Sequence, residues 1–332
     1  MTAMWMVRSD GGLRYDDFRD RSAAGIGFRQ IAALAKPGVD RKTLAKAYRE
    51  AEPGIKEQAA VVSAAQVYRF VNEIAVNDWV ITYSPDNRTY LVGTVTGPAE
   101  LHQDWADQGM GLARPITWQT VELNRDDLSP VAKNSLGPTL TVFQLSEAVR
   151  TEVLSLLHGT AAPTPSDDTV EADDPLRDFP ALAFEQIKDR VSALDWSQMQ
   201  ELVAGILRAM GYKTQVSPPG SDLGRDILAS PDGFGFERPR IVVEVKHRKG
   251  QMGSKDIRGF LGGRHPEDRG LYVSTGGFTK DARYEADRST VPLALWTPQE
   301  LTKALVDNYE NADATTRSLI TLRPLYVPAE VG

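Results

Sequence analysis

The sequence predicts two folded domains: a small α+β domain at residues 1–150 and an α/β domain at residues 181–332 with a mixed central sheet flanked by helices. The first observation is length, because 332 residues correspond to about two domains of roughly 100–200 residues each. The second is that 41% of the residues are hydrophobic, which suffices for buried cores. The third is the segment 151–180, whose composition differs from both flanking regions.

This segment separates the two domains. It holds seven acidic residues and one basic residue, and so accounts for −6 of the chain's net charge of −7. Between residues 158 and 178 it contains three prolines and almost no large apolar side chain. Such a stretch cannot bury enough surface to offset its ordering entropy, and its like charges extend it. We therefore predict an acidic, proline-containing linker between two nearly neutral domains.

The composition excludes several classes of protein. The chain has no cysteine, which rules out disulfides, thiol catalysis and cysteine-ligated zinc or iron–sulfur centres. No apolar run approaches the ~18 residues that span a bilayer. The N-terminus lacks the basic and apolar regions of a signal peptide. We therefore expect a cytoplasmic protein with no membrane partner.

The elements of the first domain change from mostly helices to mostly strands along the chain. A strand at 4–7 precedes helices at 15–21, 41–51 and 59–74, where apolar residues recur at helical spacing. Strands follow at 78–83, 90–96, 116–123 and 140–145, and a short helix ends the domain. The turn residues 84–87 join two strands as a hairpin. These elements predict a strongly bent sheet with helices.

The second domain alternates helices and strands. Helices are predicted at 182–194 and 197–210, the latter capped by Asp195 and ended by Gly211. Strands at 213–216, 226–229 and 240–247 come next. Helices at 254–261, 279–289 and 298–308 then alternate with strands at 270–274 and 293–296. Because strands joined through helices pair in parallel, part of this sheet should be parallel.

Three charged residues of the second domain form a candidate site. Side chains alternate along a strand, so Glu244 and Lys246 share one face while the flanking valines face the core. Asp226 begins the preceding strand, which a hairpin places alongside. Two acids on adjacent strands offer hard oxygen ligands suited to Mg²⁺, which supports phosphodiester hydrolysis. The alternative is an ordinary Glu–Lys pair on a half-exposed strand.

The site resembles the D…(D/E)xK core of the PD-(D/E)xK nucleases. Four motifs stand in the order seen in Mrr-like restriction endonucleases: MGY at 210–212, GSDLGRDI at 220–227, VEVKHRKG at 243–250 and STGGFTKDA at 274–282. The resemblance covers about 185–305 and implies a restriction-endonuclease-like fold. It implies a DNA nuclease that uses Mg²⁺, with Mn²⁺ as a substitute.

The resemblance also implies roles for individual residues. Asp226 and Glu244 become metal ligands, and Lys246 becomes the catalytic lysine. Many Mrr-like members carry glutamine at the position of Glu244, so the glutamate supplies a second acid here. Gln200 occupies the helix position where the family often has an acid, and we expect it to play a supporting catalytic role. Asp222 is read as a turn residue rather than a third ligand.

Basic residues surround the proposed site. From Arg240 to Arg264 the chain has seven basic and two acidic residues, which suits contact with DNA phosphates. The DNA-binding candidates are Arg248, Lys249, Lys255, Arg258 and Arg264. The alternative is a solvated helix face. The turn at 274–279 is expected to connect a strand to a helix, with Thr279 as the helix N-cap.

The first domain resembles EVE-like domains of the PUA superfamily. The resemblance rests on MWMVR at 4–8, NDWVITY at 77–83 and RTYLVG at 88–93, and covers about 4–145. It implies nucleic-acid recognition, with an aromatic pocket for a flipped, modified base as one form. The candidates for such a pocket are Trp5, Arg8, Tyr83, Arg88, Tyr90, Trp105 and Trp118. The alternative is that these side chains belong to the core.

The sequence thus predicts a restriction-type DNA endonuclease. Its first domain would locate the target, and its second would cut double-stranded DNA with Mg²⁺. One site per chain suggests a homodimer or larger homo-oligomer, because a duplex has two strands. The rivals are a DNA repair or recombination nuclease and a catalytically silent nucleic-acid sensor.

Overall fold

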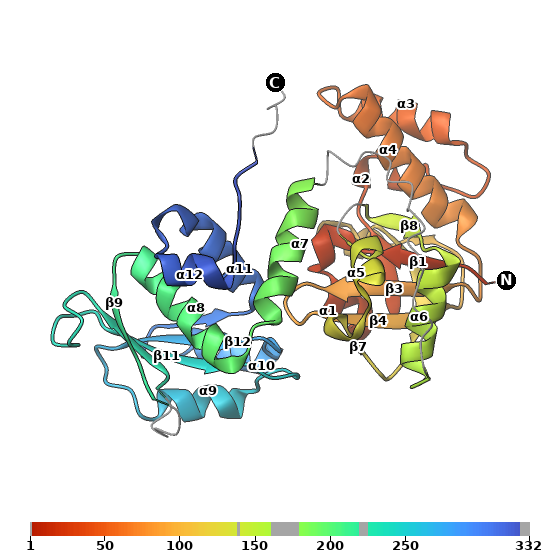
Figure 1. The fold of residues 1–332 in the computed structure, drawn as a ribbon. Coiled ribbons are helices and arrows are strands. Elements are labelled where there is room, and N and C mark those ends of the chain that lie inside the picture. The colour runs from red at the N-terminus through yellow and green to blue at the C-terminus, as the bar shows by residue number, and fades with distance from the viewer. Residues whose placement is uncertain (1, 138–139, 161–178, 219–224, 326–332) are drawn as a thin grey trace. The chain divides into compact units, whose positions relative to one another are not determined.

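A computed structural model of the chain describes residues 2–137, 140–160, 179–218 and 225–325 (Figure 1). The chain divides into two compact units, Met1–Ala183 and Phe184–Gly332. The greater part of the predicted acidic linker, together with Asp222 of the GSDLGRDI motif, lies outside the described residues. Among the described residues, no helix is both long and apolar enough to cross a membrane.

The first unit is built around one sheet. Its strands are β1 (Met4–Val7), β2 (Ala23–Ile26), β3 (Trp79–Ser84), β4 (Thr89–Val95), β5 (Glu100–Leu101), β6 (Leu112–Trp118), β7 (Leu123–Asn124) and β8 (Val142–Gln144). The order is β2-β6-β4-β3-β1-β8, with β5 paired to β6 and β7 to β4. The pair β1–β3 is parallel, and the other described pairs are antiparallel.

Helices cover both faces of this sheet. They are α1 (Tyr15–Asp20), α2 (Arg29–Ala32), α3 (Arg41–Ala51), α4 (Glu57–Tyr68), α5 (Pro130–Ser135) and α6 (Glu147–Leu157). Apolar residues of α1 to α4 form one core with Trp5, Val7 and Val80. Apolar residues of α5 and α6 form a second core with Met4, Met6 and other strand residues. Because β1 contributes alternate residues to the two cores, neither face of the strand is left to water.

The second unit holds a five-stranded mixed sheet. Its strands are β9 (Lys213–Val216), β10 (Ile227–Ser230), β11 (Ile241–Lys246), β12 (Arg269–Ser274) and β13 (Leu293–Trp296), in the order β13-β12-β11-β10-β9. The pairs β9–β10 and β10–β11 are antiparallel, whereas β11–β12 and β12–β13 are parallel. The predicted partly parallel sheet is thus confirmed, and β11 is the strand at which the direction of pairing changes.

Two helical layers enclose that sheet. The helices are α7 (Phe179–Ser192), which begins in the first unit, α8 (Trp196–Ala209), α9 (Ser254–Leu261), α10 (Lys280–Asp287), α11 (Pro298–Asp307) and α12 (Ala314–Leu319). One core joins α7, α8 and α11 to Val243 and Val245 of β11. A separate core joins α9 and α10 to Tyr272 of β12. The sheet therefore has α8 on one face and α9 on the other.

The structure corrects several predicted elements. The strand expected at 116–123 is β6 at Leu112–Trp118, because Pro115 lies inside the strand, where it needs no N–H and its carbonyl accepts a hydrogen bond from Thr96. The helix expected at 59–74 is α4 followed by a π-helical turn at Arg69–Glu73. The short elements β2, β5, β7, α2, α5 and α12 were not predicted, since each is too short for a clear periodic pattern.

Candidate active site

Strand β11 presents two chemically different faces. Val243 and Val245 lie in the core with α8, whereas Glu244 and Lys246 face the side covered by α9. Lys246 Nζ lies 2.5 Å from Glu244 Oε1. Glu244 is only 8% exposed, so its carboxylate has lost most of its hydration. The ammonium of Lys246 therefore compensates a charge that would be costly to bury alone.

Asp226 is tied to the same strand through the main chain. Asp226 directly precedes Ile227, the first residue of β10, and Ile227 pairs with Val243. The Asp226 N–H donates to the carbonyl of Val243 at 2.9 Å. Asp226 Oδ2 accepts the N–H of Val245 at 2.6 Å. These two hydrogen bonds hold Asp226 against the two residues of β11 that flank Glu244.

The donor set suits a hard divalent cation that keeps part of its hydration. Among the described residues, no group of three or more histidine or acidic side chains could hold a metal ion. Mg²⁺ is usually held by only one or two carboxylates, with waters and substrate phosphates as its other ligands. Asp226 and Glu244 meet that requirement. Gln200 adds no contact to them: none of the hydrogen bonds found between described residues joins it to either acid.

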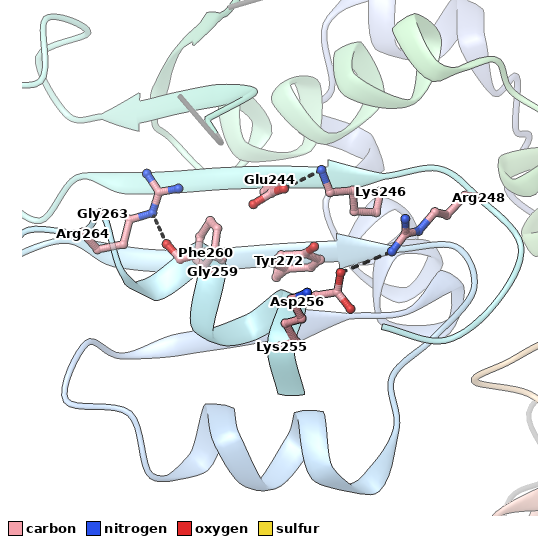
Figure 2. Close-up of a pocket in the computed structure, with 10 residues that line it drawn as sticks. All are labelled: Glu244, Lys246, Arg248, Lys255, Asp256, Gly259, Phe260, Gly263, Arg264 and Tyr272. Atoms are coloured by element: carbon pink, nitrogen blue, oxygen red, sulfur yellow. Dashed lines mark hydrogen bonds and ion pairs between the residues drawn. The ribbon is translucent and has the colours of Figure 1, made fainter. Parts of the chain in front are cut away.

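A cavity of about 750 Å³ opens beside Glu244 and Lys246 (Figure 2). Its wall combines four basic residues, two acidic residues and an aromatic pair: Glu244, Lys246, Arg248, Lys255, Asp256, Gly259, Phe260, Gly263, Arg264 and Tyr272. Arg248 pairs with Asp256 at 3.3 Å. The basic excess and the width of the cavity are compatible with an anionic ligand of phosphate type.

Arg264 is held firmly at the wall of this cavity. Its Nε donates to the carbonyl of Phe260 at 2.9 Å, and its guanidinium lies 4.3 Å from the centre of the Phe260 ring. Burial lowers the pKa of Arg264, while the charges of Glu244 and Asp268 partly offset that effect. A partly buried cation gains from an incoming anion, so Arg264 is well placed to bind a phosphate.

Tyr272 is a site residue that the sequence did not reveal. It lies beside Glu244 in the parallel register of β11 and β12 and is 1% exposed. Phe260 and Phe278 contact its ring edge-on, at centroid distances of 5.3 and 5.9 Å. Burial raises the pKa of Tyr272, and the charge of Glu244 raises it further. Its hydroxyl therefore stays protonated. The sequence could not identify Tyr272 as a site residue, because its place beside Glu244 depends on the register of β11 against β12.

The turn after β12 braces the segment that follows Lys246. The N–H of Thr275 donates to the carbonyl of Lys246 at 3.1 Å, and Thr275 Oγ1 accepts the N–H of Arg248 at 3.0 Å. A Cβ atom on Gly276 would lie 2.1 Å from the carbonyl oxygen of Gly250, so only glycine fits there. Thr279 caps α10 as predicted, accepting the N–H of Ala282.

Four predicted residues of the second unit, Asp226 among them, do not line this cavity. Gln200 is buried on α8, the helix that packs on the valine face of β11, and its Nε2 finds no partner among the described residues. Arg258 pairs with Glu285 of α10 at 3.1 Å instead of lining the cavity. Lys249 lies exposed in the loop after β11. Of the five basic candidates, Arg248, Lys255 and Arg264 reach the cavity wall.

The aromatic candidates of the first unit do not converge. Trp5 belongs to the core under α3 and α4, and its Nε1 donates to Asp78 at 3.0 Å. Tyr83 and Tyr90 lie in the opposite core with ring centres 4.8 Å apart, and the Tyr90 hydroxyl accepts a hydrogen bond from Arg125. The seven candidates therefore do not share one pocket, because strand alternation sends them to opposite faces, and Trp5, Tyr83 and Tyr90 follow the alternative that they belong to the core.

The other candidates are also engaged within the unit. Arg8 and Arg88 are buried, and Arg88 pairs with Asp126. Trp118 donates from Nε1 to the carbonyl of Phe18 at 2.9 Å. Half-buried Trp105 differs, because it stacks on His102 at 4.1 Å and lies under the Arg21 guanidinium at 4.7 Å. Trp105 and Trp118 are the two of the seven candidates that are half-buried rather than buried.

Each unit of the chain matches a known protein family. Residues 191–305 match the Mrr_cat family, described as "Restriction endonuclease". The second unit thus carries a restriction endonuclease domain. Residues 7–146 match DUF8426, a domain of unknown function, and not an EVE-like family.

Comparison with individual proteins gives weaker matches. An uncharacterized protein, y4cE of Sinorhizobium fredii, is 28% identical over 98 residues, which is 28% of this chain and 25% of that protein. The chain thus matches about a quarter of that relative's length. The modification-dependent restriction endonuclease AspBHI aligns at 13% identity and a TM-score of 0.33, covering 79% of this chain and 72% of that one. MspJI in complex with a 27-mer oligonucleotide aligns at 12% and 0.31, covering 87% and 67%.

Proposed function

We propose that the protein is a restriction-type endodeoxyribonuclease that hydrolyses phosphodiester bonds of double-stranded DNA with Mg²⁺. What supports the proposal most is the Glu244–Lys246 pair on β11, with Asp226 hydrogen-bonded to Val243 and Val245 of the same strand, inside the region that matches the restriction endonuclease family. Mn²⁺ is expected to replace Mg²⁺, because both favour carboxylate and water ligands.

Each residue then has a distinct task. Asp226 and Glu244 hold the cation, which when bound supplies charge neutralisation and a more acidic bound water. Lys246 would orient the attacking water with its ammonium. Arg264 and Arg248 bind DNA phosphates at the cavity wall. The hydroxyl of Tyr272 stays protonated and is therefore able to donate a hydrogen bond.

The first unit is proposed to locate the target, either a DNA sequence or a modified base. Of the aromatic candidates, Trp105 and Trp118 are half-exposed, and Trp105 is chosen for the test because His102 and Arg21 already stack on its ring, where a base could take the place of one of them. Substituting Trp105 by alanine should reduce discrimination between methylated and unmethylated duplexes while leaving the unit folded. Equal binding of both duplexes by the wild type would contradict modified-base recognition.

The catalytic part is tested by cleavage of a DNA panel with and without Mg²⁺. The panel contains methylated, unmodified and branched duplexes. Asp226→Ala and Lys246→Ala should each lower the cleavage rate by about 10³-fold, within the range for groups that activate water in the transition state. Both variants should still bind the duplex. Retention of binding distinguishes a lost chemical step from a lost fold.

The outcome also separates the rivals. A wild-type protein that cuts nothing in Mg²⁺ or Mn²⁺, while binding DNA, would indicate a silent sensor. Preference for branched over linear duplexes would indicate a repair or recombination nuclease. Unchanged cleavage by Asp226→Ala would refute the assignment of the site.

A further inference from the structure

Two glycines on the wall of the cavity beside Glu244 are not required by the fold. Gly259 lies inside α9, and Gly263 lies in the turn that follows it (Figure 2). Neither has a positive φ, and a Cβ atom on either would meet no other part of the described chain within 4 Å. A glycine inside a helix lowers stability relative to alanine. Neither backbone conformation nor packing therefore explains glycine at these two positions.

The two glycines share a face of the helical segment with Lys255. The three positions are four residues apart, and this spacing places side chains above one another on a helix. All three residues are exposed and line the cavity, and together they are here called the glycine row. Gly262 keeps right-handed helical angles, so Gly263 continues the row beyond α9. The row extends roughly 12 Å at about 1.5 Å per residue, which corresponds to about three nucleotides of one DNA strand at roughly 3.4 Å each.

A buried hydroxyl without a partner lies at the same cavity. Tyr272 is 1% exposed and lines the cavity, yet none of the hydrogen bonds between described residues uses its hydroxyl. Phe260 and Phe278 contact its ring edge-on and hold it in place. Buried polar groups nearly always have a hydrogen-bond partner, and a missing partner is costly. The Tyr272 hydroxyl therefore indicates a ligand that brings an acceptor oxygen into the cavity.

The charge of the cavity wall indicates which kind of ligand fits. Four cations line the cavity against two carboxylates. Lys255 takes part in none of the ion pairs found between described residues. A DNA phosphate brings a negative charge for such a cation and acceptor oxygens for a hydroxyl. Its sugar–phosphate backbone can approach the protein main chain closely where no side chain projects, as at a glycine.

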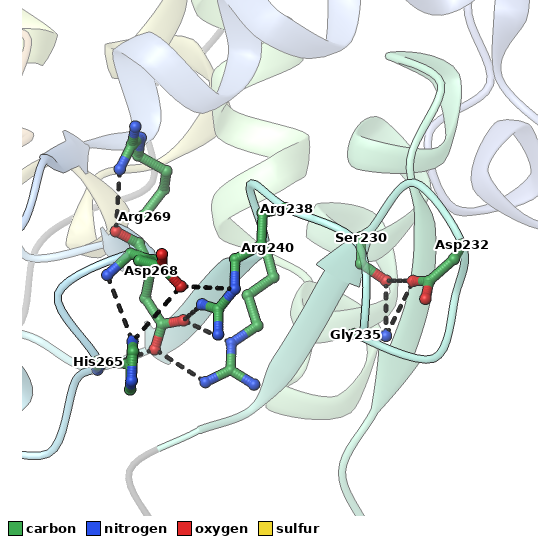
Figure 3. A network of polar contacts seen from close by, with 9 residues as sticks. Ser230, Asp232, Gly235, Arg238, Arg240, His265, Asp268 and Arg269 are labelled. Atoms are coloured by element: carbon green, nitrogen blue, oxygen red, sulfur yellow. Dashed lines mark hydrogen bonds and ion pairs between the residues drawn. The ribbon is translucent and has the colours of Figure 1, made fainter.

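The turn that carries Gly263 is fixed to the catalytic strand (Figure 3). Asp268 accepts the N–H of His265 at 3.0 Å. The same carboxylate pairs at 2.5 Å with Arg240, which directly precedes β11. The turn is thus ordered before any ligand binds, so binding at the row costs little additional conformational entropy.

We propose that the glycine row is the surface on which the sugar–phosphate backbone of the cut strand lies, and that Tyr272 donates a hydrogen bond to one of its phosphates. This inference rests on the proposed function, because the row borders the same cavity as the Glu244–Lys246 pair. The two glycines admit the strand close to the main chain. Lys255 neutralises a phosphate at one end of the row, and Tyr272 fixes the strand near the catalytic pair.

Single-turnover cleavage by Gly259→Leu tests the row. Leucine forms helices better than glycine, so the midpoint of thermal unfolding of the second unit should rise by about 2–4 °C. The new side chain occupies the place of the strand, and cleavage should fall about 100-fold, since an error of about 1 Å in substrate position has an effect of that size. A more stable but less active variant is the expected result.

Gly262→Leu is the matched control for Gly259→Leu. Gly262 does not line the cavity, and a Cβ atom there would lie 3.4 Å from the carbonyl oxygen of Arg258, an ordinary contact. The control makes the same substitution three residues away and should leave the cleavage rate within about twofold of the wild type, as expected of a surface position away from the site.

Tyr272→Phe tests the hydroxyl, because it removes one oxygen and keeps the ring. Cleavage should fall about tenfold, the value of one hydrogen bond to a charged group, while the unfolding midpoint stays unchanged. Phosphates around the cut are then replaced singly by methylphosphonates, which lack the charged oxygen. At one position the wild type and Tyr272→Phe should differ less than about twofold, because the interaction that separates them is already gone.

Protection from alkylation gives a readout that does not depend on cleavage, since the chain has no cysteine of its own. Lys255→Cys and Arg258→Cys each remove one positive charge from α9, but only position 255 lines the cavity. A duplex at about ten times its Kd should slow the reaction of N-ethylmaleimide with Lys255→Cys about tenfold and with Arg258→Cys less than about twofold.

These experiments separate the inference from the proposed function. If the wild type cuts no duplex, the proposed function fails, whereas selective protection of Lys255→Cys still supports the row as the surface that binds the strand. If Gly259→Leu cuts like the wild type, or if the duplex protects both cysteines equally or neither, the inference is wrong and the proposed function stands or falls on the cleavage assay alone.

Discussion

The two units use their polar and aromatic side chains in opposite ways. In the second unit, charged residues from β11 and α9, together with Tyr272 of β12, border one cavity. In the first unit, the aromatic side chains that were candidates for a base-binding pocket divide between two cores. The cause is the environment of the strands. Each face of β1 is covered by apolar residues, whereas one face of β11 carries Glu244 and Lys246.

The difference shows which sequence patterns indicate function. A charged pair two residues apart on a strand is costly inside a protein, so it marks a site or a solvent-facing edge. A tryptophan or tyrosine on a strand costs nothing to bury when its polar atom finds a partner. Trp5 finds Asp78, and Tyr90 finds Arg125. Aromatic residues alone therefore cannot separate a pocket from a core.

The largest expected effect tests the structural role of the first unit's aromatics. Tyr90→Ala removes a fully buried ring and should lower the free energy of unfolding of that unit by about 3–5 kcal/mol. Calorimetry should show its transition falling by roughly 10 °C while the transition of the second unit stays in place. Tyr272→Phe, the control in the second unit, keeps its ring and should leave both transitions within a few degrees. A stable Tyr90→Ala variant with altered DNA preference would instead indicate a binding pocket.

Much of the second unit could be predicted because its signals are local. The strands at 213–216 and 293–296 and the helix at 254–261 agree with the structure residue for residue. The placement of Glu244 and Lys246 on one face followed from strand alternation alone. Tyr272 could not be found this way, since its place beside Glu244 depends on the register of β11 against β12. The absence of Arg258 from the cavity wall could not be predicted either, because its partner, Glu285, lies on another helix.

Two arginines, Arg258 within α9 and Arg264 just after it, give the next largest effect. Arg264 lines the cavity, whereas Arg258 pairs with Glu285 outside it. Arg264→Ala should weaken duplex binding about tenfold and reduce the slope of log K against log salt by about 0.9. Arg258→Ala removes the same charge and should change binding less than twofold. Fluorescence anisotropy with a labelled duplex at several salt concentrations measures both. Equal losses would mean that the whole basic segment contributes only its net charge.

The smallest expected effect concerns α12, which packs on α8 behind β11. Asp313 caps α12, accepting the N–H of Thr316 at 2.8 Å and the Nε of Arg208 at 2.7 Å. A Cβ atom on Gly205 of α8 would lie 1.9 Å from Thr316 Oγ1, so α12 packs tightly on the helix that contacts Val243 and Val245. Burial alone would raise the pKa of Asp313, but the hydrogen bonds from Thr316 and Arg208 outweigh it and lower the pKa to about 2.

The lowered pKa of Asp313 determines how the stability of the second unit depends on pH. The ionised cap is favoured in the folded state, so its stabilisation is complete above the ordinary pKa of 3.8 and is lost as pH falls toward about 2.

Asp313→Ala should lower the stability of the second unit by about 1 kcal/mol at pH 7, an ordinary N-cap loss. Asp307→Ala, which removes an exposed ion pair with Lys303, should cost less than about 0.5 kcal/mol. Urea unfolding at pH 7, 4 and 2.5 measures the difference between wild type and Asp313→Ala. A difference that stays constant down to pH 2.5 would show that the ionised carboxylate is not what holds α12 against α8.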